Sequence, residues 1–157
     1  MKRIKLDKID RKILKTLQEN GRITNVDLAK IVGISAPPCL RRVRALEEAG
    51  YIQGYHARVD PHVLGYGVSV YAQVKLLSQA EGDLKKFEEQ LKEWPMVREA
   101  HMLAGETDFL LRIVAHDWDD YQNFLTHDLT AAPNVTSVKS SLAIRTSKEE
   151  PGVPVEV

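Results

Sequence analysis

Apolar and polar residues follow a helical period at the start of the chain. In "LDKIDRKILKTLQENGR" the apolar side chains recur three or four positions apart, and Lys and Arg fill the opposite side; the apolar set is Leu6, Ile9, Ile13, Leu14 and Leu17. Asn20-Gly21 follows, and both residues tolerate the left-handed conformation that often ends a helix. The pattern predicts an amphipathic helix that stops at Asn20-Gly21.

A second, shorter helix is predicted in "TNVDLAKIVG". Thr24 is a good N-cap, and Asp27 three positions later resembles a capping box with Asp in place of Glu. We assign its buried side to Val26, Leu28, Ala29, Ile31 and Val32. Gly33 permits a sharp turn, and Ser35 is placed to cap the next helix. A helix, a tight glycine turn and a capped helix have the spacing of a helix-turn-helix.

The helix after this turn, "SAPPCLRRVRALEE", opens with two prolines. With Ser35 as N-cap, Ala36, Pro37 and Pro38 occupy the first three helical positions, where N–H groups have no intrahelical partner. The prolines therefore make the first turn rigid at little cost in hydrogen bonds. A core stripe is expected at Cys39, Leu40, Val43 and Leu46, with the arginines of this helix pointing elsewhere.

This helix is the candidate for reading DNA, because the start of the second helix of a helix-turn-helix meets the base edges. Compact prolines there can lie against thymine methyl groups, and arginines can bind phosphates or guanines. The alternative is an ordinary solvated helix face. The predicted DNA-binding residues are Asn25, Ser35, Ala36, Pro37, Pro38, Arg41, Arg42 and Arg44.

The segment after Gly50 has strand-like composition. Its apolar and aromatic residues are Tyr51, Ile52, Tyr55, Ala57 and Val59, which favour a short β wing or connecting strand and hence a winged helix. Asp60-Pro61 breaks the pattern. We place a DNA-binding domain at 1–60, a second domain at 61–148 and a tail at 149–157.

The second domain alternates strands and helices. Strands are predicted at 66–77, 96–103, 108–115 and 135–144. Helices are predicted at 81–94, buried through Leu84, Phe87, Leu91 and Trp94, and at 117–129, buried through Trp118, Tyr121, Phe124 and Leu125. The order βαββαβ predicts a ferredoxin-like sheet with both helices on one face, so the whole chain is α+β. The uncovered face predicts a homodimer.

Charge separates the two halves, although the net charge of the 157 residues is zero. Residues 1–60 carry 13 Lys and Arg against 7 Asp and Glu, whereas residues 61–157 carry 9 against 15. A basic front half suggests a polyanionic partner, and two ordinary solvated surfaces are the alternative.

Other chemistry is sparse in this sequence. One cysteine, Cys39, builds no disulfide framework and fits a reducing compartment. The five histidines have no zinc spacing, and there is no phosphate loop or nucleophile elbow, so we expect no metal, no cofactor and no catalytic residue. Without a long apolar run or a secretory signal, we expect a cytoplasmic protein with no membrane partner.

The front half, "LDKIDRKILKTLQENGRITNVDLAKIVGISAPPCLRRVRALEEAGYIQGY", resembles the DNA-binding half of the Lrp/AsnC family of transcription regulators. The motifs "GETDFLL" and "PNVTSVKSS" are typical of that family's second domain, and the resemblance runs from about Leu6 to about Lys148. It implies binding to double-stranded DNA, dimers formed through the C-terminal sheets and assembly often to octamers. It also implies an amino-acid effector held between dimers.

The resemblance implies an effector site at Met102, Gly105, Glu106, Thr107, Asp108, Trp118, Ser141, Leu142 and Ala143. Ser141 stands where the leucine-responsive member has tyrosine, and Thr107 stands where an aromatic residue would sit, so leucine is not assumed as ligand. Backbone N–H groups near Gly105 can approach a carboxylate, and Asp108 can accept from an ammonium. The alternative is that both residues only shape a β-turn.

Two other functions remain to be weighed. Small enzymes also use ferredoxin-like dimers, and His101 or Asp108 could act as a base, although no second catalytic group is evident. A winged helix can also bind protein, which the arginines argue against. We expect a DNA-binding regulator that responds to a small effector, and no enzyme.

Overall fold

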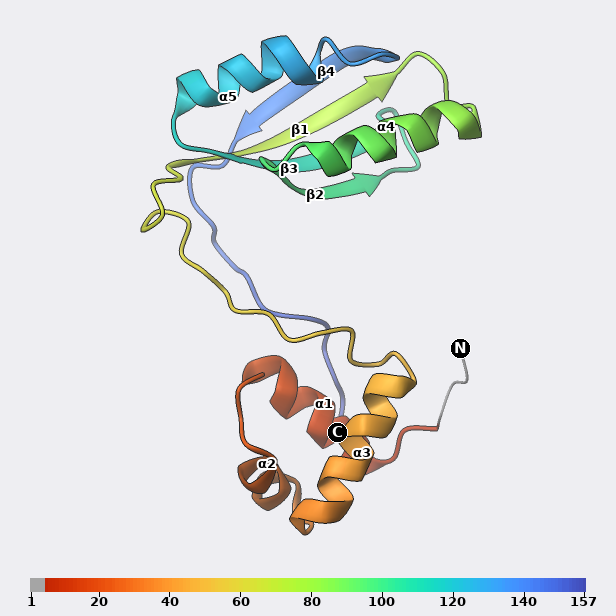
Figure 1. The fold of residues 1–157 in the computed structure, drawn as a ribbon, viewed down its shortest axis with the longest axis vertical. Helices are drawn as coiled ribbons and strands as arrows, with labels where there is room; N and C mark the ends of the chain where they lie inside the picture. Colours follow the sequence, from red (N-terminus) through yellow and green to blue (C-terminus); the bar gives the residue numbers. More distant parts are fainter. Residues whose placement is uncertain (1–4) are drawn as a thin grey trace. The chain divides into compact units, whose positions relative to one another are not determined.

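The computed structural model describes residues 5–157, so the first four residues of the predicted DNA-binding domain lie outside it. The chain divides into two compact units (Figure 1). The N-terminal unit comprises the residues up to Arg58 together with Lys148–Val157, and the sheet unit comprises Val59–Ser147. The division after Arg58 lies close to the boundary expected at Asp60-Pro61. The tail, expected as a separate segment, clusters with the N-terminal unit.

The N-terminal unit contains α1 (Lys8–Glu19), α2 (Asn25–Val32) and α3 (Ala36–Glu48). Its core is made by apolar side chains from each of these helices: Ile13, Leu28, Ala29, Val32, Cys39 and Leu46. Gly33 has a φ of +81°, which is the left-handed conformation expected at the turn between α2 and α3. The helix-turn-helix expected from the sequence is therefore present.

Some apolar residues of this unit that we predicted to be buried are exposed. Val26 and Ile31 of α2 are 54% and 57% exposed, and Leu40 of α3 is 40% exposed. At about 100° per residue, each lies more than a quarter turn from the centre of its helix's buried stripe. The neighbouring helices cover only the side of each helix that packs against them, so the broader stripe assigned from sequence was wrong at these three positions.

The wing is absent as a strand in this structure. Residues 52–60 form no strand, although their strand-like composition predicted one. Strand composition alone is insufficient because a strand needs a partner for its backbone groups, and none of the strands that the structure describes pairs with this segment.

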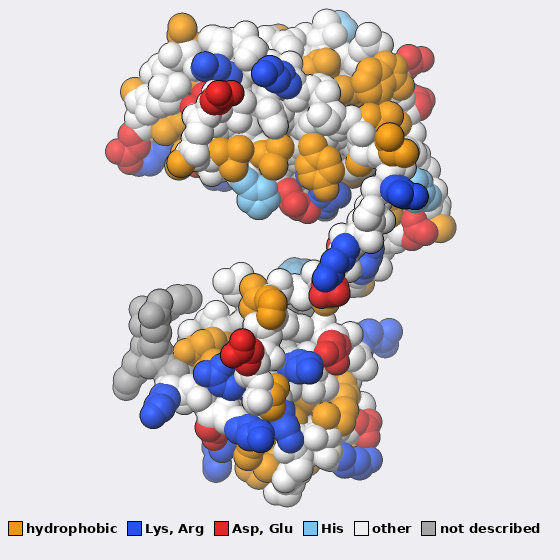
Figure 2. All heavy atoms as spheres, turned by 180° about the vertical axis from the view of Figure 1, so that it is seen from behind, with side chains coloured by type: hydrophobic (Ala, Val, Ile, Leu, Met, Phe, Trp, Pro, Cys, Tyr) orange, Lys and Arg blue, Asp and Glu red, His pale blue; other side chains and the backbone are white. Residues whose placement is uncertain are grey.

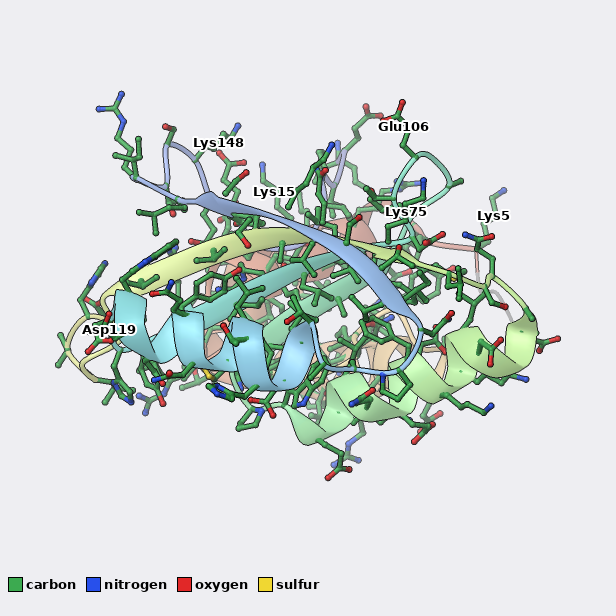
Figure 3. The ribbon with its side chains drawn as sticks, turned by 90° about the horizontal axis from the view of Figure 1, so that it is seen from above. Lys5, Lys15, Lys75, Glu106, Asp119 and Lys148 are labelled. Atoms are coloured by element: carbon green, nitrogen blue, oxygen red, sulfur yellow. The ribbon has the colours of Figure 1, made fainter. Side chains whose placement is uncertain are left out.

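The sheet unit has the predicted βαββαβ order. Its strands are β1 (Val68–Leu76), β2 (Val97–Met102), β3 (Phe109–Ala115) and β4 (Val135–Leu142). They pair antiparallel in the order β2-β3-β1-β4. The helices α4 (Glu81–Glu93) and α5 (Trp118–Phe124), the latter continued by the π-helical turn η1 (Leu125–Leu129), cover one face of the sheet (Figure 3).

The core of the sheet unit lies between the sheet and these helices. Phe87 and Leu91 of α4 fill it together with Trp94 at the C-cap of that helix, and Tyr121 and Phe124 fill it from α5. Trp118, predicted to be buried, is 47% exposed. It stands at the first position of α5, at the margin of the helix–sheet interface, and its ring lies 5.4 Å from that of Tyr121.

The outer face of the sheet is uncovered in the protomer. Buried and exposed residues alternate along β1, where Val70, Ala72 and Val74 face the helices and Tyr71 faces outward at 42% exposure. Tyr71 is paired across the sheet with Arg112 on β3 and Ser141 on β4. No helix among residues 5–157 is long and apolar enough to span a bilayer.

Candidate DNA-binding surface and effector site

The start of α3 departs in one detail from the predicted cap. Ser35 has the extended backbone of an N-cap, with φ −76° and ψ 157°, but its side chain makes no capping hydrogen bond. An N-cap oxygen normally accepts from the second or third helical N–H group. Those positions are Pro37 and Pro38, which have no N–H. The exposed Ser35 hydroxyl is therefore left available to a partner outside the helix.

One face of α3 is open to solvent beyond this first turn. A shallow depression runs along it, lined by Pro37, Leu40, Arg41, Arg44, Ala45 and Glu48. Arg41 and Arg44 are exposed and form no ion pair with any residue of the described part of the chain. Lys and Arg side chains are also spread over the N-terminal unit in Figure 2. This face presents cations beside apolar surface.

Arg42 lies apart from that face. Its guanidinium donates to Asp7 at 2.8 Å and to Asp10 at 2.7 Å, which joins α3 to the beginning of α1. Asp10 is buried, and its side chain is 11% exposed. This placement argues against the direct DNA contact that the sequence suggested for Arg42, because a DNA contact would withdraw the charge that compensates a buried carboxylate.

The same two aspartates cap α1. The Asp7 carboxylate accepts from the Asp10 N–H at 2.8 Å, and the Asp10 carboxylate accepts from the Asp7 N–H at 3.1 Å. The hydrogen bond from the Asp10 backbone, followed by the contact with Arg42, lowers the pKa of Asp7. The contacts with Asp10 and Asp7 raise the pKa of Arg42. This capping box was not predicted from the sequence, although Asp7 and Asp10 have the same spacing as Thr24 and Asp27.

Asn25 is also occupied within the helix-turn-helix. Its Nδ2 donates to the backbone oxygen of Ala36 at 2.8 Å, which ties the start of α2 to the first turn of α3. Its Oδ1 is buried and has no partner among the residues described. Ala36 and Pro38 are half-buried, whereas Ser35 and Pro37 are exposed. Of the predicted DNA-binding residues, Asn25 and Arg42 thus hold the helix in place.

The candidate effector loop joins β2 to β3. Leu103 N–H donates to the Asp108 carbonyl at 2.8 Å, which closes the loop around Gly105 and Glu106. Asp108 also binds β1: its N–H donates to Val74 O at 2.9 Å, and its Oδ2 accepts from Leu76 N–H at 2.7 Å. One carboxylate oxygen of Asp108 therefore fastens the loop to the sheet.

Gly105 has no steric reason to be glycine within the protomer. Its φ lies outside the left-handed region, and a Cβ placed on it would meet nothing within 4 Å. Within the protomer, position 105 therefore has room for a larger side chain.

The predicted effector residues fall into two groups within the sheet unit. Met102 and the loop Gly105–Asp108 lie where β3 begins, and Trp118 lies beyond the end of β3. Ser141 and Leu142 pair with Tyr71 and Val70, and Ala143 N–H donates to Ser69 O, so they lie toward the Trp118 end.

The seven residues of β3 separate Asp108 from Trp118, which is about 20 Å at the rise of a strand. Ser141, Leu142 and Ala143 lie level with Arg112, Ile113 and Val114, four to six positions from Asp108, or about 13–20 Å along the strands. Figure 3 labels Glu106 and Asp119, the neighbour of Trp118, at opposite ends of the sheet. One protomer therefore does not bring the two groups together.

A further contact near the second group was missed from sequence. The hydroxyls of Tyr121 on α5 and Ser140 on β4 form a hydrogen bond beneath the sheet, and burial raises the pKa of Tyr121. Among residues 5–157, no group of three His, Cys, Asp or Glu side chains is placed to hold a metal ion.

Comparisons with known families and proteins assign both units. Residues 6–53 match the winged helix-turn-helix DNA-binding family, and residues 69–153 match the Lrp/AsnC ligand binding domain.

Individual relatives agree with these matches. The chain is 52% identical over 147 residues to the leucine-responsive regulatory protein of Rhizobium meliloti, covering 94% of each chain. It is 45% identical over 140 residues to the Bkd operon transcriptional regulator of Pseudomonas aeruginosa, covering 89% of this chain and 92% of that one. A solved transcriptional regulator from Neisseria meningitidis, in complex with L-Met, superposes with a TM-score of 0.91 at 35% identity, covering 96% and 97%.

Proposed function

Because this chain belongs to the Lrp/AsnC family of transcriptional regulators, we propose that the open face of α3 reads operator DNA while Asn25 and Arg42 hold that helix in position. The observation that carries the proposal is the pair Arg41 and Arg44, exposed beside Pro37 on one face of α3. Ser35 donates its uncommitted hydroxyl to a phosphate. The relatives are named as regulators, which confirms the expected regulator and gives the enzyme alternative no support.

A salt titration of operator binding with single alanine variants tests this assignment. A base-reading arginine changed to alanine costs about 1–3 kcal/mol and relaxes specificity at one base pair, whereas a phosphate-binding one weakens all sequences and flattens the salt slope. If the double variant Arg41→Ala/Arg44→Ala binds the operator as tightly as the wild type, the proposal is wrong.

We propose that the effector is an amino acid. The solved relative from Neisseria meningitidis is a complex with L-Met, which supports this class of ligand. Backbone N–H groups of the loop around Gly105 receive the carboxylate, and Asp108 receives the ammonium through the oxygen that does not bind Leu76. Trp118, Ser141, Leu142 and Ala143 come from another protomer, because in one chain they lie about 13 Å or more along the strands from Asp108.

The proposed site therefore requires assembly. We propose a dimer through the outer face of the sheet around Tyr71, and association of dimers, to an octamer or a similar particle, that completes the effector site. A protein that binds chromosomal DNA in this way works in the cytoplasm.

A thermal-shift screen against the twenty amino acids, followed by light scattering with the best ligand, tests both points. A ligand at a hundred times its dissociation constant adds about 2.7 kcal/mol of stability. If no amino acid stabilises the protein, or if the stabilised species is a monomer, this effector site is wrong.

A further inference from the structure

The C-terminal tail, Lys148–Val157, is bound to α1 through one side chain. The Val153 N–H donates to Gln18 Oε1 at 2.9 Å, and Gln18 Nε2 donates to the Val153 carbonyl at 2.9 Å. A side-chain amide carries one acceptor and a donor group, so it can satisfy both backbone groups of one residue, as a neighbouring strand would. Gln18 thereby binds both backbone polar groups of one tail residue.

The backbone at Gly152 is shaped for this contact. Gly152 has a φ of +66°, and a Cβ added there would lie 1.9 Å from Gln18 Oε1. A side chain at position 152 would therefore be strained by its own backbone and would collide with the receiving group. Glycine is needed at this position if Val153 is to reach Gln18.

A second contact fixes the direction of the tail. Arg58, the last residue before the sheet unit, pairs with Glu149 at 2.6 Å. Both side chains are more than half exposed, so the pair adds little binding energy by itself. The tail also carries Glu149, Glu150 and Glu156 against Lys148 alone, opposite in sign to the basic N-terminal unit.

We propose that Gln18 and Arg58 form a docking site for the tail of the same chain, and that the docked tail is a second tether between the two units. The first connection leaves the N-terminal unit after Arg58, and the second returns to it at Lys148, six residues after Leu142 ends β4. Two connections restrict the rotation of the DNA-binding helices more than one flexible linker does.

Hydrogen exchange tests the docking. Gln18→Ala should speed exchange of the Val153 amide roughly tenfold, since it loses its acceptor. The matched control is Glu19→Ala, which changes the exposed neighbour on α1 and should leave that amide unchanged. Gly152→Ala should act like Gln18→Ala without altering α1. Exchange at Val153 that is the same in all four proteins overturns the docking.

Cross-linking tests whether the tether stays within one chain. Gln18→Cys with Val153→Cys, treated with a short bismaleimide, should give an adduct within a single chain, and the buried Cys39 should not react. Glu19→Cys with Val153→Cys is the matched control and should react less. An adduct between two chains, or none, overturns a tether within the chain.

The restraint itself has a DNA readout, which rests on the proposed two-fold DNA binding. Gln18→Ala should weaken binding to a two-half-site operator by roughly three- to tenfold and leave binding to a single half-site unchanged. Equal effects on both DNAs, or none, overturn the restraint. If wild-type protein binds neither DNA, the proposed function fails, whereas the Val153 exchange still reports on docking.

Discussion

At the scale of single residues, neighbouring arginines on α3 differ in their surroundings. Arg41 and Arg44 are exposed, whereas Arg42 lies between Asp7 and Asp10 of α1. From sequence these arginines were equivalent, because the partner of Arg42 comes from a helix more than thirty residues earlier. Only the packing of α3 against α1 separates this structural cation from the neighbours that we propose to face DNA.

We expect Arg42→Ala to lower the free energy of unfolding by about 1–3 kcal/mol, because it leaves the buried Asp10 carboxylate without its charged partner. Urea denaturation measures this. Arg41→Ala is the control and should change stability by less than about 0.5 kcal/mol while weakening operator binding. The reverse pattern, with Arg41 stabilising and Arg42 neutral, would contradict the assignment.

The pKa of Asp7 predicts a pH dependence. Because the folded-state pKa is lower than the ordinary 3.8, the ionised form stabilises the fold above that value, and this contribution is lost as pH falls below it. We expect the urea midpoint of the wild type to drop more than that of Asp7→Asn as pH is lowered from 5 to about 2.5. Parallel curves for the two proteins would show that Asp7 is not responsible.

Asp108→Asn should separate the two duties of that side chain. The amide oxygen can still accept from Leu76 N–H, so the loop should keep its place and DNA binding without ligand should survive. Loss of the charge-assisted hydrogen bond to an ammonium should weaken the amino acid by roughly one to two decades. Calorimetry measures the affinity of both proteins for the amino acid found in the screen. An unchanged affinity would show that Asp108 only anchors the loop.

At the scale of elements, the sequence predicted the order of helices and strands because period and end signals agreed. The helix-turn-helix and the βαββαβ order followed from apolar spacing, from Gly33 and from β-branched runs. Three features did not follow. The wing lacked a pairing partner, the buried side of α2 was drawn too wide at Val26 and Ile31, and the cap at Ser35 had no N–H groups to bind. Each depends on contacts that one-dimensional periodicity does not contain.

The site was harder to predict than the fold for the same reason. The resemblance named residues at both ends of the sheet, and pattern gives no distance between Asp108 and Trp118. The structure does, through the strand register.

Two glycines should respond differently to alanine. Gly33→Ala forces a left-handed residue into the turn of the helix-turn-helix, and we expect a loss of about 1–2 kcal/mol in unfolding free energy. Gly105→Ala, with open space and an ordinary φ, should leave the protomer's stability within about 0.5 kcal/mol. Thermal unfolding measures both. A large loss at Gly105 would show that the loop itself requires glycine.

At the scale of the whole molecule, the proposed dimer through the outer face of the sheet would set how many recognition helices meet DNA. Tyr71 lies on that face in a central strand, flanked across the sheet by Arg112 and Ser141. In the proposed dimer, a two-fold axis through this face pairs the helix-turn-helix units, and we expect the recognition helices to address half-sites about 34–36 Å apart or a multiple of this.

Tyr71→Asp should break this dimer, because it replaces a large aromatic ring with a carboxylate, which is costly to desolvate, at the centre of the proposed interface. We expect the dimer dissociation constant to rise at least about a hundredfold, as for a central interface residue. Light scattering at micromolar concentration measures it. The control is Glu88→Ala on the helix-covered side, which should leave the mass unchanged. A dimer that persists in Tyr71→Asp would place the two-fold interface elsewhere.

The paired prolines at the start of α3 also make this protein sensitive to base chemistry. Pro37 and Pro38 lack N–H groups, so the backbone of this helix start offers a phosphate fewer donors than usual. In the proposed complex the prolines therefore meet the bases through carbon, and the Ser35 hydroxyl is left to bind phosphate. Carbon surface in the major groove recognises the 5-methyl group of thymine, which uracil lacks and 5-methylcytosine carries. Operators with deoxyuridine at the contacted step should bind more weakly by a margin that salt does not change. Conversely, DNA that carries 5-methylcytosine at the contacted step should bind more tightly than the same DNA with unmodified cytosine.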